Sequence, residues 1–380
     1  MVTETTQNNP TTIEQTLFMA LELSNTEWRL GFTIGLGQPP RLRKLEAHDL
    51  KGLMEEIEWS KKRFGLPADA PVMSCYEAGR DGFWLHRFLI AQGVRNHVVD
   101  SASIEVNRRK RRAKTDRIDV GKLLTMLVRA AQGESQVWSV VNPPSPEEED
   151  QRQLHRDLMA LKRERTHHIN RIKGLLASQG VKMAIKMDFL TQLETVRLWD
   201  GSGLGSGIRD RLEREYQRDQ LVQAQIRQID QIRREAIRYA ETPALEQVRQ
   251  LLRLKGIGVN SAWVYVMEFF AWRNFRNRRE LGALAGLAPT PYQSGDSGRE
   301  QGISKAGNRP VRAMAIEIAW AWVRHQPDSA LSLWYQKRFG HGNSRIRRIG
   351  IVALARKLLI ALWRYLEFGV LPEGALLKEV

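Results

Sequence analysis

The sequence predicts an α/β part followed by an all-α part. Over residues 15–137, apolar runs typical of strands alternate with segments that have helical spacing. After a stretch with three prolines and an acidic run, 138–150, apolar residues recur mostly at helical spacing. The single cysteine, Cys75, excludes an internal disulfide and a cysteine-built zinc site, and its place in an apolar run predicts a buried, inert thiol.

The α/β part begins with three successive strands. A polar segment, 1–14, is predicted to be a disordered tail, and strands follow in TLFMALELS, WRLGFTIG and the RLRKLEAH region. Next come a helix in HDLKGLMEEIEWSKKRF, a strand in PVMSCYEAG, a helix in DGFWLHRFLIAQG and a strand in VRNHVVD, before a helix that opens with TDRID. This order predicts a three-layer domain, 15–137, around a central mixed sheet.

The helical part is predicted to have two sections joined to the α/β domain by a linker at 138–150. In 151–244, two long charged helices, 151–179 and 208–240, flank the glycine-rich DGSGLGSG, which favours an antiparallel hairpin or a coiled-coil dimer arm. The section 245–380 is predicted to be a compact helical domain.

Three histidines lie in the first long helix: His155, His167 and His168. No acidic partner at ligand spacing accompanies them, so they are interpreted as surface residues.

The charge balance favours a polyanionic partner. The chain has 59 Lys and Arg against 43 Asp and Glu, a formal charge of +16. Such an excess is typical of a protein that binds nucleic acid rather than a small acidic metabolite. No apolar run reaches the roughly 18 residues that span a bilayer, and the polar start lacks the parts of a signal peptide. We therefore expect a soluble, cytoplasmic protein with no membrane partner.

Two aspartates follow a basic run. Asp116 and Asp119 lie on one face of the helix that begins there, because residues three apart share a face. Two close carboxylates repel each other unless a cation lies between them, and Mg²⁺ suits such an all-oxygen site. Alternatively, Asp116 only caps the helix and Asp119 complements its dipole. The basic run would position a nucleic-acid strand, and it consists of Arg108, Arg109, Lys110, Arg111, Arg112 and Lys114.

Two glutamates are placed unusually for strand residues. Glu22 stands in the apolar strand FMALELS, and Glu77 follows the apolar strand PVMSCY. An acid in such a strand is costly to bury without a cation or a hydrogen-bonding network. We expect both to converge with Asp116 and Asp119 at one edge of the sheet, where four carboxylates can hold two divalent ions for phosphodiester chemistry.

Four sequence blocks, in order, resemble the insertion sequence 110 family of transposases, the Piv-like, bridge-RNA-guided recombinases. They are FMALELSNTEW, CYEAGRDGFWLHRFL, KTDRIDVGKL and GIG…LAGLAPTPYQSG…GISKAGNRPVR, and they cover essentially 17–325. The resemblance implies an N-terminal RuvC-like ribonuclease H fold with a DEDD carboxylate set, a helical coiled-coil segment and a C-terminal helical transposase domain with a nucleophilic serine. It also implies DNA as the substrate and a noncoding bridge RNA as the guide.

Matched by position, the resemblance makes Glu77, Asp116 and Asp119 metal ligands. The family's first carboxylate is usually an aspartate, whereas this chain has Glu22. Its extra methylene leaves open the choice between Mg²⁺ and Mn²⁺, because octahedral Mg²⁺ is strict about geometry.

The resemblance places the nucleophilic serine in APTPYQSGDSGREQGISKAGN. Ser294 precedes a glycine and is the predicted nucleophile, although Ser297 also precedes a glycine and Ser304 is a third candidate. A serine hydroxyl needs activation by nearby metal ions or cations to attack a phosphate.

Two further groups are predicted to contact the nucleic-acid backbone. The turn KGIGVN, with Lys255, Gly256 and Gly258, resembles a helix-hairpin-helix turn, although a plain interhelical turn explains it as well. Three cations, Lys305, Arg309 and Arg312, flank the start of the helix after the serine segment.

The resemblance therefore implies a transposase or recombinase. Because one chain carries one set of catalytic groups, we expect it to act as a homo-oligomer, a dimer or tetramer on nucleic acid. Two alternatives stay open. One is a RuvC-type structure-specific endonuclease in which water attacks, and the other is a noncatalytic nucleic-acid-binding protein.

Overall fold

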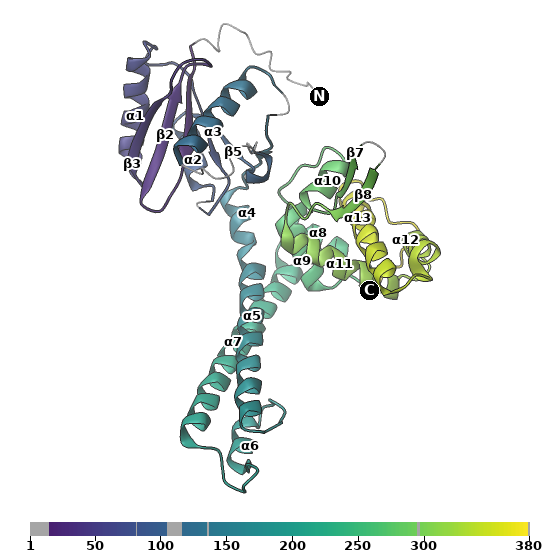
Figure 1. The fold of residues 1–380 in the computed structure, drawn as a ribbon. Helices are drawn as coiled ribbons and strands as arrows, with labels where there is room; N and C mark the ends of the chain where they lie inside the picture. The colour runs from purple at the N-terminus through teal and green to yellow at the C-terminus, as the bar shows by residue number, and fades with distance from the viewer. Residues whose placement is uncertain (1–14, 81, 105–115, 135–136, 295–296, 379–380) are drawn as a thin grey trace. The chain divides into compact units, whose positions relative to one another are not determined.

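The computed structural model describes residues 15–80, 82–104, 116–134, 137–294 and 297–378 (Figure 1). The chain divides into two compact units, Met1–Pro144 and Ser145–Val380. The first unit is α/β, as predicted. In the described residues the second unit is helical apart from one β-hairpin, which departs from the predicted all-α part. Both the predicted disordered tail, 1–14, and the basic run at 108–114 lie outside the described residues.

The first unit is built on a six-stranded sheet in the order β3-β2-β1-β4-β5-β6. The strands β1, β4 and β5 are parallel, whereas β2, β3 and β6 run antiparallel to their neighbours, which confirms a mixed sheet. Their bounds are β1 Leu17–Glu22, β2 Glu27–Thr33, β3 Arg41–Glu46, β4 Val72–Glu77, β5 Arg95–Val99 and β6 Val140–Val141. The strand β6 lies within the predicted linker and was not predicted, because two residues are too few to show a strand pattern.

Helices cover both faces of this sheet: α1 (Leu50–Arg63) and α2 (Trp84–Ala91) on one face, and α3 (Asp116–Ala131) on the other. A short 3-10 turn, Ser101–Ser103, follows β5. Along β1 the side chains alternate, so Met19 packs with α1 and α2 while Phe18 packs with α3. This alternation confirms the predicted three layers.

The second unit begins with a long helical hairpin. It comprises α4 (Pro146–Gln151), α5 (Gln153–Ser178), α6 (Phe189–Thr195) and α7 (Ser206–Tyr239), and α5 lies alongside α7 (Figure 1). The acidic run in the predicted linker is the first turn of α4. There Ser145 and Glu148 form a reciprocal capping box, and Pro146 occupies the first helical turn.

The rest of the second unit is a helical core around buried residues such as Trp263, Tyr265 and Trp322. The two short π-helical turns are labelled η4 and η5. The elements are α8 Pro243–Leu252, α9 Val259–Tyr265, η4 Val266–Phe270, α10 Arg278–Leu284, β7 Pro289–Ser294, β8 Ser297–Ile303, α11 Arg309–His325, α12 Ala330–Tyr335, η5 Gln336–Gly340 and α13 Ser344–Phe368. No helix among the described residues is both long and apolar enough to cross a membrane.

The surface interpretation of the histidines is wrong for two of the three. His155 is completely buried and lies 2.8 Å from Glu268, and His168 is mostly buried and lies 2.6 Å from Glu215. Only His167 is exposed. Both acidic partners come from distant segments, so the spacing within one helix could not reveal them.

Candidate functional site

Two of the predicted carboxylates meet at the carboxyl-terminal edge of the sheet. Glu22 ends β1 and Glu77 ends the parallel neighbour β4, and Leu21 pairs with Tyr76 one position before them. Both glutamates line a cavity of about 410 Å³, which the loop residues after each strand and Leu123 of α3 also line. Ligands bind in open α/β sheets at this edge, so the cavity is the first candidate site.

The helix α3 carries the other two predicted carboxylates in its first turn. Asp119 lies one turn before Leu123, which lines the cavity, and residues four apart share a helical face. Val120 and Leu124 pack against the sheet and fix the position of α3. The side chains of Asp116 and Asp119 lie outside the described part of the chain, so the convergence of all four carboxylates stays a prediction.

The donor set at the cavity is compatible with a divalent ion. Glu22 is partly buried and Glu77 is exposed at the cavity wall. Within the described residues no group of three or more His, Cys, Asp or Glu could hold a metal ion. Cys75 does not contribute. Its thiol packs against α3, 3.7 Å from the carbonyl oxygen of Leu123, and burial strongly raises its pKa.

The second candidate site is the β-hairpin of the helical unit. Ser294 ends β7 and Ser297 begins β8, and the two serines are paired across the ladder. Ser294 and Ser297 therefore lie at the same end of the two-stranded ladder, which is the tip of the hairpin. Ser304 lies at the other end, where its backbone N–H donates to the carbonyl of Ala288.

The predicted cations lie at the base of this hairpin. Lys305 and Arg309 are exposed and Arg312 is half-buried, with a guanidinium 2.9 Å from the carbonyl oxygen of Lys305. At about 3.3 Å per strand residue, Ser297 is roughly 20 Å from the end of β8. The structure thus groups the cations with Ser304 and separates them from the tip that carries Ser294.

At the base of the β-hairpin, the close approach of the end of α10 to the start of α11 depends on Gly307. Its φ is +114°, and an added Cβ would lie 2.2 Å from the carbonyl oxygen of Leu284. The next residue, Asn308, donates its backbone N–H to the same oxygen and caps α11 by accepting from Val311. The glycine therefore lets the end of α10 touch the start of α11, which fixes the hairpin between them.

The KGIGVN turn is tied into the helical core. The N–H of Lys255 donates to the carbonyl of Leu376, and the Lys255 carbonyl accepts from the Gln326 side chain. The carbonyl of Ile257 accepts from Lys378. Because the Lys255 N–H is already used, the turn has fewer amides for a phosphate than the helix-hairpin-helix interpretation assumes. The role of Gly256 and Gly258 in nucleic-acid binding stays a prediction.

A buried ionic cluster that the sequence did not reveal links the start of α5 to the base of the β-hairpin. Glu268 of η4 is 2% exposed and accepts hydrogen bonds from His155 at 2.8 Å and from Arg156 at 2.7 and 3.1 Å. The Asn308 amide lies 3.5 Å away. Burial acts to raise the pKa of Glu268, but the hydrogen bonds from His155 and Arg156 outweigh it and hold the pKa at about 2. Glu268 is therefore ionised at neutral pH and anchors the start of α5.

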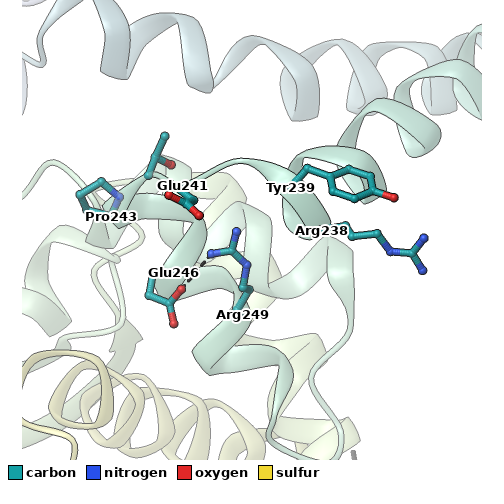
Figure 2. A pocket seen from close by; sticks show the side chains of 7 residues that line it. Arg238, Tyr239, Glu241, Pro243, Glu246 and Arg249 are labelled. Atoms are coloured by element: carbon teal, nitrogen blue, oxygen red, sulfur yellow. Dashed lines mark hydrogen bonds and ion pairs between the residues drawn. The ribbon is translucent and has the colours of Figure 1, made fainter.

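Residues at the connection between α7 and α8 line a cavity of about 490 Å³ (Figure 2). Arg249 is central to it. Its guanidinium donates to the carbonyls of Ile237 and Ala240 at the end of α7 and to Glu246 at 2.8 Å. The arginine therefore satisfies carbonyls that the end of a helix leaves unpaired, which gives these contacts a structural role.

The β-hairpin lies within the part of the chain that matches a known family of proteins. Residues 248–334, which include both candidate serines and Glu268, match the family model described as Transposase IS116/IS110/IS902 family. A protein of Sinorhizobium fredii named "Putative transposase y4rJ" is 42% identical over 379 residues, 95% of this chain and 94% of that protein.

More distant relatives match part of the chain. The transposase for insertion sequence element IS1328 of Yersinia enterocolitica is 25% identical over 225 residues, 59% of this chain and 64% of that protein. The transposase for insertion sequence element IS1111A of Coxiella burnetii is 27% identical over 231 residues, 58% of this chain and 59% of that protein.

Proposed function

This chain belongs to the IS116/IS110/IS902 family of transposases, and we propose that it cuts and rejoins DNA through a covalent serine intermediate, guided by a noncoding bridge RNA. One observation carries the catalytic part of this proposal. Glu22 and Glu77, from neighbouring parallel strands, line one cavity beside the helix whose first turn contains Asp116 and Asp119. Family membership itself makes the chain a transposase and implies DNA as its partner.

The first unit is then a RuvC-like ribonuclease H domain. Its mixed sheet, with helices on both faces, supports this assignment. Glu22, Glu77, Asp116 and Asp119 would hold Mg²⁺ or Mn²⁺, and the bound ion would offset the negative charge of the scissile phosphate. The chain itself would supply the nucleophile and the cations that orient the strand.

Ser294 Oγ would attack a DNA phosphorus. The bond from phosphorus to the 3′-oxygen breaks, the serine proton leaves to solvent, and the 3′-oxygen takes up a proton. The 5′ end is then held as a phosphoserine. In the second step the 3′-hydroxyl of a partner strand attacks the phosphorus of this phosphoserine and gives up its proton. The bond from phosphorus to Ser294 Oγ breaks, and Ser294 regains a proton. Each step exchanges one phosphate ester for another, so the reaction needs no ATP.

Strand exchange between two DNAs requires several cuts, and each chain supplies one serine. The protein would therefore act as a homo-oligomer, a dimer or tetramer. A basic protein that contacts the backbone without reading sequence suits guidance by base pairing with the RNA.

Denaturing gels of labelled DNA test the serine step. Ser294→Ala should eliminate the protein–DNA adduct and strand exchange but leave DNA binding nearly intact, since one hydroxyl contributes about 1 kcal/mol to ground-state contacts. The matched controls are Ser297→Ala, across the ladder, and Ser304→Ala, at the hairpin base.

The other outcomes are equally informative. An adduct that survives Ser294→Ala but is lost in Ser297→Ala would move the nucleophile across the hairpin. Free DNA ends without any adduct from the unmutated protein would favour the RuvC-type endonuclease. Binding without cleavage in Mg²⁺ or Mn²⁺, with guide RNA present, would favour the noncatalytic alternative.

A further inference from the structure

One stretch of the helical unit carries positive charge without local compensation. Between Asp328 and Glu367 the chain has no acidic residue but eight Lys or Arg. Five of these residues are exposed around the turn from η5 into α13, and we call them the basic patch: Lys337, Arg338, Arg345, Arg347 and Arg348. The chain elsewhere pairs many of its cations with carboxylates, as at Arg249 and Arg218.

The patch is held together by its own turn. The Tyr335 hydroxyl contacts the carbonyl of Arg347 at 3.4 Å, and Arg347 donates to the carbonyl of Gly342 at 3.0 Å. Asn343 caps α13 by accepting from Ile346. These contacts fix the turn before α13, and Phe339 of η5 packs against Gly350 of α13, so the two elements that carry the cations are in contact. No ion pair connects the five side chains to a carboxylate among the described residues.

The position of the arginines opposes helix stability. Helices favour acidic residues in the first turn, where the dipole is positive, and α4 follows this rule with three glutamates. In α13 the first turn has no acid and contains Arg345 and Arg347, with Arg348 next. Placing cations there is unfavourable for the helix, which an anionic partner bound at this end would offset.

The surface also projects from the core. All seven residues from 343 to 349 are exposed, so the first two turns of α13 are open all round. Ile346 and Ile349 are 41% and 54% exposed. Two isoleucines form too small an apolar patch to dominate, and a second copy would bring five more positive charges against the same surface. Charge therefore selects a polyanion rather than another protein.

We infer that the basic patch binds the phosphate backbone of duplex DNA without reading its sequence; the inference rests on the proposed function only in taking DNA as the partner. The patch is separate in the chain from the hairpin cations Lys305, Arg309 and Arg312. It would provide a second set of backbone contacts that positions DNA on the helical unit.

The test measures binding as a function of salt. Each phosphate that a cation neutralises contributes about 0.9 to the slope of log affinity against log salt concentration. The triple variant Lys337→Gln, Arg345→Gln, Arg348→Gln should therefore reduce the slope by about 2.7 on labelled DNA duplexes, equally for unrelated sequences. The thermal midpoint should stay unchanged or rise, because two arginines leave the first turns of α13.

The helix α7 offers a matched control in which the same number of positive charges is removed. Arg209→Gln, Arg211→Gln, Arg214→Gln also removes three exposed arginines near the start of a helix, but these alternate with Asp210 and Glu213. This control should leave the slope nearly unchanged. An unchanged slope in the patch variant, or equal reductions in both variants, would overturn the inference.

Two further measurements fix the partner. An effect confined to RNA duplexes of the same sequence would overturn the assignment to DNA, as would a loss of self-association in sedimentation with unchanged DNA binding. All binding is measured in EDTA with uncleaved duplex, so the outcome does not depend on Ser294 or on metal. Loss of the adduct in Ser294→Ala with an unaffected patch variant would support the proposed function and reject the patch alone.

Discussion

Replacing Glu268 by glutamine should destabilise the protein at neutral pH by about 2–3 kcal/mol. The carboxylate is 2% exposed and is hydrogen-bonded to His155 and Arg156. Those hydrogen bonds hold its pKa at about 2, although burial acts in the opposite direction. Glutamine keeps the size of the side chain but removes its charge, so Arg156 and His155 lose the partner that fixes the start of α5.

The size of the effect follows from the pKa. A decrease from 4.5 to about 2 corresponds to roughly 3 kcal/mol of stability at pH 7. The Arg156 side chain is 50% exposed, so solvent screens part of its interaction and the expected loss is nearer 2–3 kcal/mol. Because the folded-state pKa lies below the unfolded value, this stability is present above about pH 4.5. It is lost as the pH falls toward 2.

Urea unfolding at pH 7, 5 and 3 measures the effect. The difference between the unmutated protein and Glu268→Gln should be nearly constant from pH 7 to 5 and should fall to less than half by pH 3. Glu246→Gln is the control, since Glu246 pairs with Arg249 at the same 2.8 Å but is 71% exposed, and it should cost at most about 0.5 kcal/mol (Figure 2). Equal losses in the two variants, or a Glu268→Gln loss that persists unchanged at pH 3, would refute this account.

Three further substitutions test the candidate sites. Asp116→Ala or Asp119→Ala should abolish strand cleavage without lowering the thermal midpoint, because removing one of several repelling carboxylates relieves repulsion; cleavage at the unmutated rate would remove both residues from the site. Gly307→Ala should cost about 2–4 kcal/mol, because the new Cβ meets the Leu284 carbonyl and φ is +114°. Gly207→Ala, which has open space around it at the start of α7, should cost nothing, and similar thermal midpoints for the two alanine variants would contradict the close approach at Gly307.

Much of the fold could be predicted from local periodicity. The strand β1 is a short continuous apolar run, which is typical of a strand buried on both faces, and α5 repeats its apolar residues at helical spacing. The hairpin of β7 and β8 gives no such signal. Its first strand, PTPYQS, contains two prolines, and its second, SGREQGI, contains two glycines, so propensity favours a loop. Only pairing between the two segments makes them strands.

The serine position shows where sequence patterns cannot discriminate. Ser294 precedes Gly295 and Ser297 precedes Gly298 in the sequence, and the structure pairs the two serines across the ladder. The two serines therefore have similar sequence contexts and similar places in the backbone. Only an experiment such as adduct formation in the alanine variants can distinguish them. The position of the cations is easier to assign. Lys305 and Arg309 follow β8, so they lie at the base of the β-hairpin and not at the tip that carries the serines.

Glu268 shows that one physical rule can indicate two different kinds of residue. An acid within an apolar run singled out Glu22, and the same rule applied to VMEFF would have singled out Glu268. His155 could not have been recognised this way, because its partner lies 113 residues away in the chain. The structure separates the two cases by what surrounds each carboxylate. Glu268 is enclosed by a histidine and an arginine of its own chain, which satisfy it, whereas Glu22 lines an open cavity beside Glu77. A buried acid that receives its cations from the protein stabilises the fold, whereas two acids that line one cavity at a sheet edge support the proposed metal site.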